Sequence, residues 1–435
     1  MANNTTVPKN NYGLKSILRA LHSRNYRLFF FGQGISLIGT WMQQIAMSWL
    51  VYRLTNSTVL LGVVGFASQI PIFILPPFIG VFADRWNKRR FVIIIQSLAM
   101  LQAFILAFLI LSNMIEVWHI IILGLFLGVV NSMDIPVRQS FVIGMVENKE
   151  DLGNAIALNS SLVNVGRLLG PSIGGILIYI VGEGLCFLLN GVSYIAVIAS
   201  LFAMKIKPVK SVVQHPNILR GIKEGFTYSF GSVPIRSILL LLTLVSIIGM
   251  PYQLLMPVFA RDILHGTSQT QGFLMAASGI GALGGSIFLA SRKSVIGLGK
   301  LISSATIIFG CGLIFFSVSR LVIISLIFMM ITGYGMIVQL ASSNTVLQTI
   351  TDDDKRGRVM SFYTMSFRGM SPFGSLMTGI LASSVGAPIT LTIGGICCIL
   401  GGLLFARKLP SLRKLVKPIY IQKGILPQTE ESAAM

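Results

Sequence analysis

The chain has 435 residues, of which 54% are hydrophobic and only 11% are charged, although its formal net charge is +20. Soluble domains carry about 25% charged residues, so this composition excludes a soluble globular protein. About 20 consecutive apolar residues suffice for a helix to cross a bilayer, and lipid offers no partner to unpaired backbone groups. We therefore predict an all-α membrane protein.

Twelve apolar runs follow one another along the chain, separated by shorter polar segments. We expect transmembrane helices near 26–51, 59–82, 91–112, 117–137, 153–181, 184–204, 236–260, 270–291, 299–317, 320–349, 357–385 and 387–406.

The basic residues fall almost entirely in alternate gaps between these spans. With both termini in the cytoplasm, only Arg53, Arg261 and Arg320 of the 34 Lys and Arg lie on the outer side, and Arg167 and Arg368 lie within spans. Cytoplasmic loops of membrane proteins are enriched in Lys and Arg. The charge therefore indicates topology and not nucleic acid binding, and attraction to anionic membrane lipid is a secondary effect.

An internal repeat divides the spans into two sets of six. At an offset of 210 residues, Ser36, Gly39, Gln43 and Gly62 match Ser246, Gly249, Gln253 and Gly272. At an offset of 204 residues, Gly170 and Gly175 match Gly374 and Gly379. Such repeats are typical of secondary transporters, which place the substrate site near the midplane between the halves.

The repeat and the charge pattern together give the expected organisation: a cytoplasmic segment 1–25, a six-helix bundle 26–204, a cytoplasmic linker 205–235, a second six-helix bundle 236–406 and a cytoplasmic tail 407–435. In the linker, the apolar side chains that recur at helical spacing are Ile218, Leu219, Ile222, Phe226 and Phe230. They predict a short amphipathic helix along the inner membrane surface.

Two motifs carry a family resemblance. The stretch "GVFADRWNKRR" is similar to the loop between the second and third helices of the major facilitator superfamily, with motif positions at Gly80, Asp84, Arg85, Asn87, Lys88 and Arg89. Asn87 replaces the usual Gly, and because Asn tolerates a left-handed backbone we expect the tight turn to be retained. "GRLLGPSIGG" resembles the motif of proton-driven antiporters, filled by Gly166, Gly170, Pro171, Gly174 and Gly175, with Ala157 in place of a Gly of its longer form.

The chain thus resembles a major facilitator superfamily transporter over residues 15–406, and most resembles the bacterial branch that includes the enterobactin exporter and drug-efflux proteins. The resemblance implies two pseudo-symmetric six-helix bundles in the bacterial inner (cytoplasmic) membrane, with both termini cytoplasmic. It also implies a small-molecule substrate, coupling to protons and a functional monomer, with no cofactor and no metal.

The resemblance also implies a charge relay at the cytoplasmic side, formed by Asp84, the cations of the loop and an acid at the inner end of the fourth span. Asp134 is that acid, and Arg138 follows one turn later. We expect Asp134 to pair with Arg85 or Lys88 and to hold this side closed. The alternative is a solvated loop that only follows the charge rule, and we prefer it for Arg89 because exposed ion pairs contribute only about 0–1 kcal/mol.

Polar residues within the spans define the candidate substrate cavity. On the first span a stripe at helical spacing is formed by Gln33, Ser36, Thr40, Gln43 and Gln44, and the remaining candidates are Ser246, Tyr252, Gln253, Asn131, Gln339 and Asn344. They either contact substrate or form hydrogen bonds between helices.

Arg167 and Arg368 are the unusual residues, because a charge within the bilayer costs from about 3 kcal/mol upward. Either they bind an anionic substrate such as a catecholate or carboxylate siderophore, or they clamp backbone carbonyls of neighbouring helices.

Together these features predict a secondary transporter that works by alternating access, a proton-driven exporter of a siderophore or drug-like amphiphile. The alternatives are a lysophospholipid transporter of the same fold and a membrane sensor that transports nothing. An enzyme is not expected: the four His are scattered, and no Gly-x-x-x-x-Gly-Lys nucleotide-binding motif is present.

Overall fold

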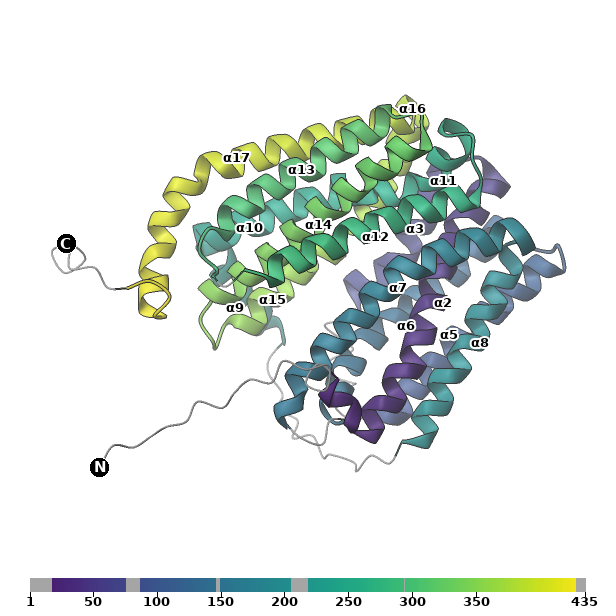
Figure 1. Cartoon of the computed structure of the whole chain (residues 1–435), viewed down its shortest axis with the longest axis horizontal. Helices are drawn as coiled ribbons and strands as arrows, with labels where there is room; N and C mark the ends of the chain where they lie inside the picture. Colours follow the sequence, from purple (N-terminus) through teal and green to yellow (C-terminus); the bar gives the residue numbers. More distant parts are fainter. Residues whose placement is uncertain (1–17, 76–86, 146–148, 205–217, 293, 428–435) are drawn as a thin grey trace.

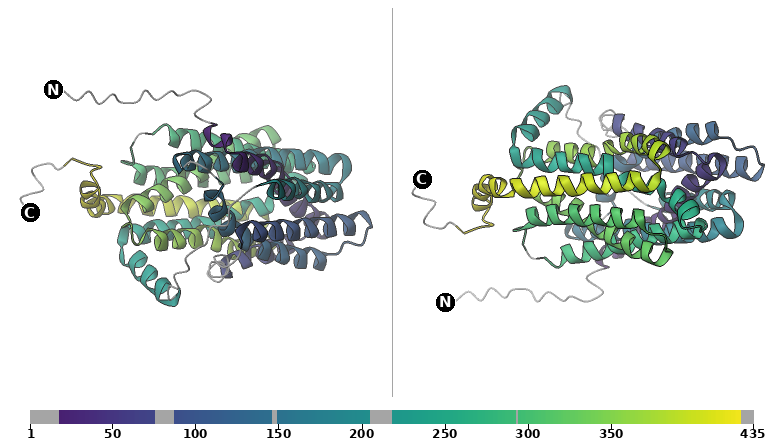
Figure 2. Two further views of the ribbon diagram at one scale, coloured as in Figure 1. Left: turned by 90° about the horizontal axis from the view of Figure 1, so that it is seen from below. Right: turned by 90° about the horizontal axis from the view of Figure 1, so that it is seen from above.

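The structure is a computed structural model and describes residues 18–75, 87–145, 149–204, 218–292 and 294–427. Within these ranges the regular structure is entirely helical, and it forms two bundles that lie side by side (Figures 1 and 2). The first bundle, the N half, comprises α2 Arg24–Thr55, α3 Thr58–Ile74, α5 Lys88–Leu111, α6 Val117–Ile143, α7 Leu152–Val181 and α8 Glu183–Ala203, with short 3₁₀ turns at Arg19–His22 and Lys149–Asp151.

The second bundle, the C half, contains several interrupted helices. Its seventh span is assembled from α10 Val233–Leu244, η3 Val245–Gly249, η4 Met250–Leu255, α11 Met256–Val258 and η5 Phe259–Ile263. It continues with α12 Ser268–Ala290, α13 Leu298–Val318, α14 Val322–Ile350, α15 Arg356–Thr364, η6 Met365–Gly369, α16 Ser371–Val385 and α17 Ala387–Gln422. Among the described residues, nine helical segments are long and apolar enough to cross a membrane, and α3 is a shorter apolar helix. The expected all-helical membrane fold is confirmed.

The C half contains π-helical turns at η3, η5 and η6. The corresponding first span of the N half, α2, runs as one α-helix of 32 residues. π turns are rare and are concentrated at functional sites in proteins. The two halves therefore share a plan but differ in local helix geometry.

Local sequence sets the helix starts. Ser57 caps α3 by accepting a hydrogen bond from Leu60 N at 3.3 Å, and Thr267, 210 residues later, caps α12. Asn87 caps α5 by accepting from Arg90 N at 3.3 Å, with φ −64°. The expectation of a left-handed Asn87 is therefore wrong, because its side chain serves here as an N-cap in extended backbone.

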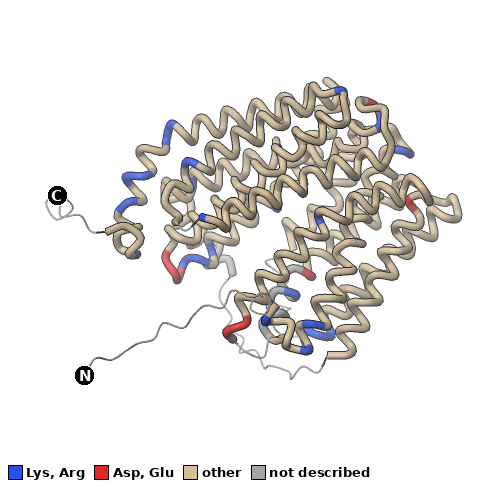
Figure 3. Tube along the Cα trace, in the orientation of Figure 1, with Lys and Arg blue, Asp and Glu red and all other residues tan. Residues whose placement is uncertain are grey.

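The charged residues divide the molecule into two ends. Lys and Arg gather at the end where α2 and α5 begin (Figure 3), which we call the basic end. The opposite end, where α3 begins and α7 finishes, is the closed end, because the two halves touch there. The halves diverge from this contact toward the basic end (Figure 1).

Two glycine crossings make that contact. α7 meets α12 at Gly175 and Gly272, and α3 meets α16 at Gly62 and Gly379. A Cβ at Gly272 would lie 2.5 Å from the Pro171 carbonyl oxygen, and one at Gly379 would lie 2.6 Å from the Thr58 carbonyl oxygen. The backbones can approach this closely only because both positions lack side chains.

The linker region ends in α9 Ile218–Gly231, so a helix forms where the apolar spacing predicts one. Its Phe226 and Phe230 rings lie 6.1 and 6.2 Å from the ring of Phe362 on α15, and Glu224 pairs with Arg358 at 2.6 Å. This helix is therefore packed against α15 of the C half.

We predict that Gly272→Val opens the closed end, because the added side chain collides with backbone atoms of α7. Spin labels at Met114→Cys and Ile323→Cys, both exposed at the closed end in different halves, would show a longer distance by electron paramagnetic resonance in a background without the native cysteines.

Gly284→Val on the same helix is the matched control, since nothing lies within 4 Å of a Cβ at that position. If the distance between the two spin labels is unchanged in Gly272→Val, the glycine crossing is not the contact that closes this end.

Candidate functional site

Side chains from both halves meet at the closed end. Tyr52 donates its hydroxyl hydrogen to Asp262, and Arg261 Nη1 donates to Asn56 Oδ1 at 2.7 Å. The guanidinium of Arg261 also lies 5.9 Å from the centre of the Tyr52 ring. A polar cluster thus bridges α2 and the end of the seventh span.

Hydrogen bonds to backbone reinforce both glycine crossings. Thr58 Oγ1 donates to the Gly379 carbonyl and Ser268 Oγ donates to the Gly175 carbonyl, each at 3.0 Å. Thr58 and Ser268 are 210 residues apart, so the two bonds are related by the internal repeat. The closed end is therefore held by the same arrangement twice.

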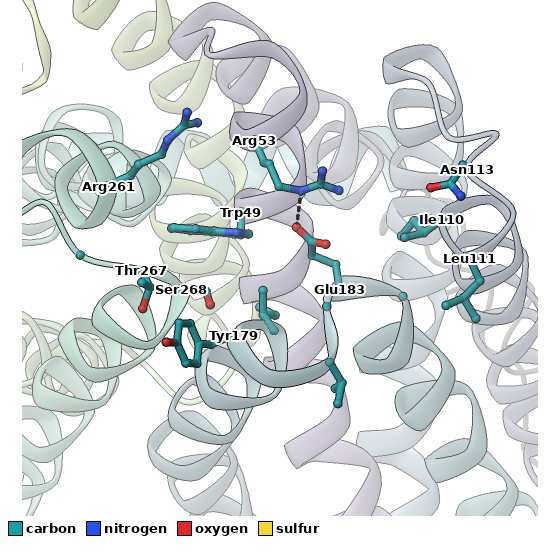
Figure 4. Close-up of a pocket in the computed structure, with 15 residues that line it drawn as sticks. Trp49, Arg53, Ile110, Leu111, Asn113, Tyr179, Glu183, Arg261, Thr267 and Ser268 are labelled. Carbon is teal, nitrogen blue, oxygen red and sulfur yellow. Dashed lines mark hydrogen bonds and ion pairs between the residues drawn. The ribbon is translucent and has the colours of Figure 1, made fainter.

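A hollow of about 620 Å³ lies beside this contact at the closed end. Figure 4 shows Trp49 between Arg261 and the ion pair of Arg53 with Glu183, whose atoms are 2.7 Å apart. The hollow combines an indole ring with two cations and one acid, and it adjoins the surfaces that must part for this end to open.

Sequence reasoning matched the glycines of the closed end but did not select its polar residues. The repeat offset of 210 residues could have identified two of them, because it also relates Tyr52 to Asp262. Each is the repeat equivalent of the other, so their hydrogen bond crosses the pseudo-two-fold axis itself.

The polar stripe on α2 divides into two sets. Thr40 and Gln44 are exposed, whereas Gln33 and Ser36 are buried with a side-chain oxygen that has no partner among the described residues. A lipid-facing surface is apolar, so exposed polar side chains in a span indicate a surface that faces the interior between the halves.

Gln43 belongs to a buried network instead. Its Nε2 donates to Gln102 Oε1 at 3.0 Å, and its Oε1 accepts from Asn190 Nδ2 at 2.5 Å. All three side chains are 4% exposed or less. This geometry matches the alternative of hydrogen bonding between helices, here α2, α5 and α8.

The candidates of the C half are likewise mixed. Tyr252 is fully buried with its hydroxyl 2.9 Å from Ser278 Oγ, and Gln253 is half-buried and donates to Tyr252. Gln339 is buried, and neither of its amide atoms has a partner in the described part of the chain. Asn344 is half-buried and accepts from Gln348. The remaining candidate, Asn131, is also half-buried and lies on α6 of the N half.

Arg167 on α7 is the less accessible of the two arginines within spans. Its Nε is buried and lacks a hydrogen-bond partner among the described residues, and its guanidinium carbon lies 5.3 Å from the centre of the Trp41 ring. Contact with an aromatic face stabilises a cation by about 0.5–2 kcal/mol. That contact leaves the Nε donor of Arg167 without a hydrogen-bond partner among the described residues.

Arg368 lies in the π turn η6 and is exposed, although protein surrounds it on most sides. A charged side chain that is exposed within a span favours a surface between the halves over one that faces lipid. Arg167 and Arg138 are both within electrostatic range of Arg368. In the described ranges, no carboxylate forms an ion pair with Arg167 or Arg368.

Ser246 connects two of the π turns, η3 and η6. Its hydroxyl, fully buried in η3, donates to the carbonyl of Phe367 at 2.6 Å, one residue before Arg368. This hydrogen bond therefore holds the turn that carries Arg368 against the seventh span.

Asp134 on α6 is 8% exposed and has two partners. Its Oδ1 accepts from Gln96 Nε2 and its Oδ2 pairs with Arg138, each at 3.0 Å. Among the described residues Asp134 forms no ion pair with Lys88, and Gly80, Asp84 and Arg85 lie outside the described residues. Arg89 donates to the carbonyls of Leu201 and Phe202, so it caps the end of α8.

The glycines of the antiporter-like motif are packing positions in this structure. A Cβ at Gly170 would lie 2.4 Å from Trp41 Cβ and one at Gly174 would lie 3.0 Å from Met42, so α7 packs closely on α2. Gly166 faces Trp41 as well, while Gly175 faces α12. Pro171 lies inside α7 and its carbonyl approaches Gly272.

These observations define a class: a helical membrane protein of two repeated halves, closed at one end, with cations on the surface between them. Such an arrangement is that of a secondary transporter.

Comparison with known proteins gives the family. Residues 15–418 match the family of transmembrane secretion effectors, and the chain belongs to that branch of the major facilitator superfamily. Its members are transporters and not enzymes, and the superfamily resemblance of the sequence is confirmed.

Curated relatives and solved structures agree with this assignment. The chain is 27% identical over 376 residues to the staphyloferrin A transporter of Staphylococcus aureus, covering 86% of this chain and 93% of the relative. It is 22% identical over 393 residues to the enterobactin exporter EntS of Escherichia coli, covering 89% and 92%. A bacterial homolog of the human lysosomal transporter Spinster, inward-facing and unoccupied, has a similar fold, with a TM-score of 0.67 at 14% identity, covering 92% of this chain and 98% of that chain.

We predict that Gln43→Leu and Gln44→Leu separate structure from transport. Gln43→Leu leaves Gln102 and Asn190 unsatisfied, at a cost of about 1–3 kcal/mol, and should lower the apparent Tm in detergent. Gln44→Leu should leave the Tm unchanged and raise the KM for transport. A lower Tm in Gln44→Leu would contradict the assignment of Gln44 to the surface between the halves. An unchanged Tm in Gln43→Leu would contradict the role of Gln43 in the buried network of α2, α5 and α8.

Proposed function

We propose that this transporter exports an anionic small amphiphile, of the carboxylate or catecholate siderophore class, by proton-driven alternating access. The observation that carries the proposal is the position of Arg167 and Arg368. Two cations from different halves, within electrostatic range of each other and without a carboxylate partner in the described ranges, form a site for an anion.

The cost of placing these charges supports the proposal. An arginine in the membrane interior is costly unless an anion, water or carbonyl groups solvate it. Arg138 is already paired with Asp134, whereas the one partner of the Arg167 guanidinium recorded in the described part of the chain is the Trp41 ring. A carboxylate or catecholate oxygen between Arg167 and Arg368 would supply the missing acceptor and form charge-assisted hydrogen bonds.

The relatives support the direction and the substrate class. One is named as a transporter of staphyloferrin A and another as an exporter of enterobactin. The neutral polar groups Thr40 and Gln44 and the ring of Trp41 would contact the rest of the ligand. Selectivity among such molecules depends on these neutral contacts, because the arginines recognise only the charge.

The structure is that of one state in an alternating cycle. If the basic end is cytoplasmic, as the charge rule predicts, the divergent halves present Arg368 and Thr40 to the cytoplasm while the glycine crossings exclude the outside. Export then requires the Tyr52–Asp262 contact to break and the basic end to close.

Asp134 is the proposed proton carrier. Protonation would remove the charge that attracts Arg138 and weaken acceptance from Gln96, and would thereby alter the packing of α5 on α6. Such a change links proton binding to the geometry of the N half without direct contact between proton and substrate.

We predict that Arg167→Gln and Arg368→Gln each lower transport of an anionic siderophore by about tenfold or more, since hydrogen bonds to charged groups contribute about 1.5–3 kcal/mol. The measurement is efflux of labelled siderophore from cells with matched protein levels. Arg236→Gln, which removes an exposed cation at the start of α10, is the control. Transport at the wild-type level in both variants would rule out the anion site.

We predict that Asp134→Asn abolishes proton-driven export, because an amide cannot take up and release the proton. A deletion strain should accumulate its own siderophore, a protonophore should reproduce that accumulation, and Asp134→Asn should not restore export. If accumulation changes only for lysophospholipid, the fold assignment stands and the siderophore proposal fails.

A further inference from the structure

The last helix extends well past its membrane span. α17 continues to Gln422, and Leu409, Leu412 and Val416 in the extension pack back on the apolar core of the C half. Lys423 Nζ donates to the carbonyl of Thr351 at the end of α14, at 2.8 Å. The extension is therefore folded across the basic end of the C half, as Figures 1 and 2 show.

A cavity of about 510 Å³ lies between this extension and the starts of α10 and α13. Its volume falls in the range of about 300–1,000 Å³ that is typical of ligand pockets. The apolar side chains that line it include Ile238, Ile302, Val346, Phe405, Leu409 and Leu412. The cavity can therefore accept a hydrocarbon chain.

Cations surround the apolar interior. Lys300, Arg413, Lys414 and Lys417 belong to the lining, are all exposed, and have no acidic side chain beside them among the lining residues that the structure describes. The cavity thus combines an apolar interior with four positive charges at its solvent side. A ligand that matches both features carries an anionic head on an acyl chain.

The position of the cavity indicates the source of such a ligand. Lys300 lies two residues after the start of the membrane span α13. Lys and Arg gather at the basic end of the molecule (Figure 3). Anionic phospholipids of the inner leaflet are attracted to basic residues next to membrane spans. A basic amphipathic helix such as the extension of α17 also lies favourably in the interface of the bilayer.

We propose that this cavity binds an anionic phospholipid, with an acyl chain against Phe405 and Leu412 and the phosphate beside Lys300, Arg413 and Lys417. The site lies wholly in the C half and does not use the arginines between the halves. It is therefore independent of the proposed transport function.

The test is native mass spectrometry of the full-length protein, titrated in detergent with dioleoyl-phosphatidylglycerol, dioleoyl-phosphatidylcholine or oleate. Phosphatidylglycerol should bind the wild type at least tenfold more tightly than phosphatidylcholine. The triple variant Lys300→Gln, Arg413→Gln, Lys417→Gln should bind phosphatidylglycerol at least tenfold more weakly. Lys300→Gln alone, a milder change, should weaken binding by about threefold.

The matched control removes three cations from the same end of the other half: Arg24→Gln, Arg27→Gln and Arg90→Gln, all exposed. This control should bind phosphatidylglycerol like the wild type. Equal losses in the two triple variants, equal binding of the two phospholipids, or binding of oleate alone would each overturn the proposal.

Discussion

The close approach of glycine backbones at the closed end is the constraint on which the rest of the structure depends. Gly62 against Gly379 and Gly175 against Gly272 bring the halves into contact at two places related by the internal repeat. Thr58 and Ser268 donate across these crossings, and the Tyr52–Asp262 bond lies on the axis between them. With this end fixed, the divergence of the halves toward the basic end determines which side chains face the interior.

The interior surface follows from that geometry. The exposed face of α2 offers Thr40 and Gln44, α7 offers Arg167, and the π turn η6 offers Arg368. Gln43, one residue before Gln44, points into the N half, where Gln102 and Asn190 occupy its amide group. A rotation of about 100° between adjacent helical residues thus separates a residue that holds helices together from one that can contact a ligand.

The positions of the helices could be predicted from the sequence because hydropathy and charge act locally along the chain. The repeat could also be read from matched glycines, and four of them proved to be contact points between the halves: Gly62, Gly175, Gly272 and Gly379. The assignment of Gln43 could not be predicted, since a polar stripe does not show which of its members meets a neighbouring helix. Asn87 was misjudged because a helix cap and a left-handed turn favour the same residue type. The π turns leave no recognisable signal in the sequence, and the partners of Arg368 and Asp262 depend on contacts between distant segments.

The π turns give the two halves different mechanical properties. α2 and α7 are α-helical throughout, whereas the spans that carry Ser246, Asp262 and Arg368 are each interrupted where those residues lie. Helices bend most readily where the regular hydrogen-bond ladder is broken. The C half is therefore the more compliant body and the N half the stiffer one. A force exerted on Arg368 would be absorbed first by bending within the C half, so sequence symmetry between the halves does not imply that they share the motion equally.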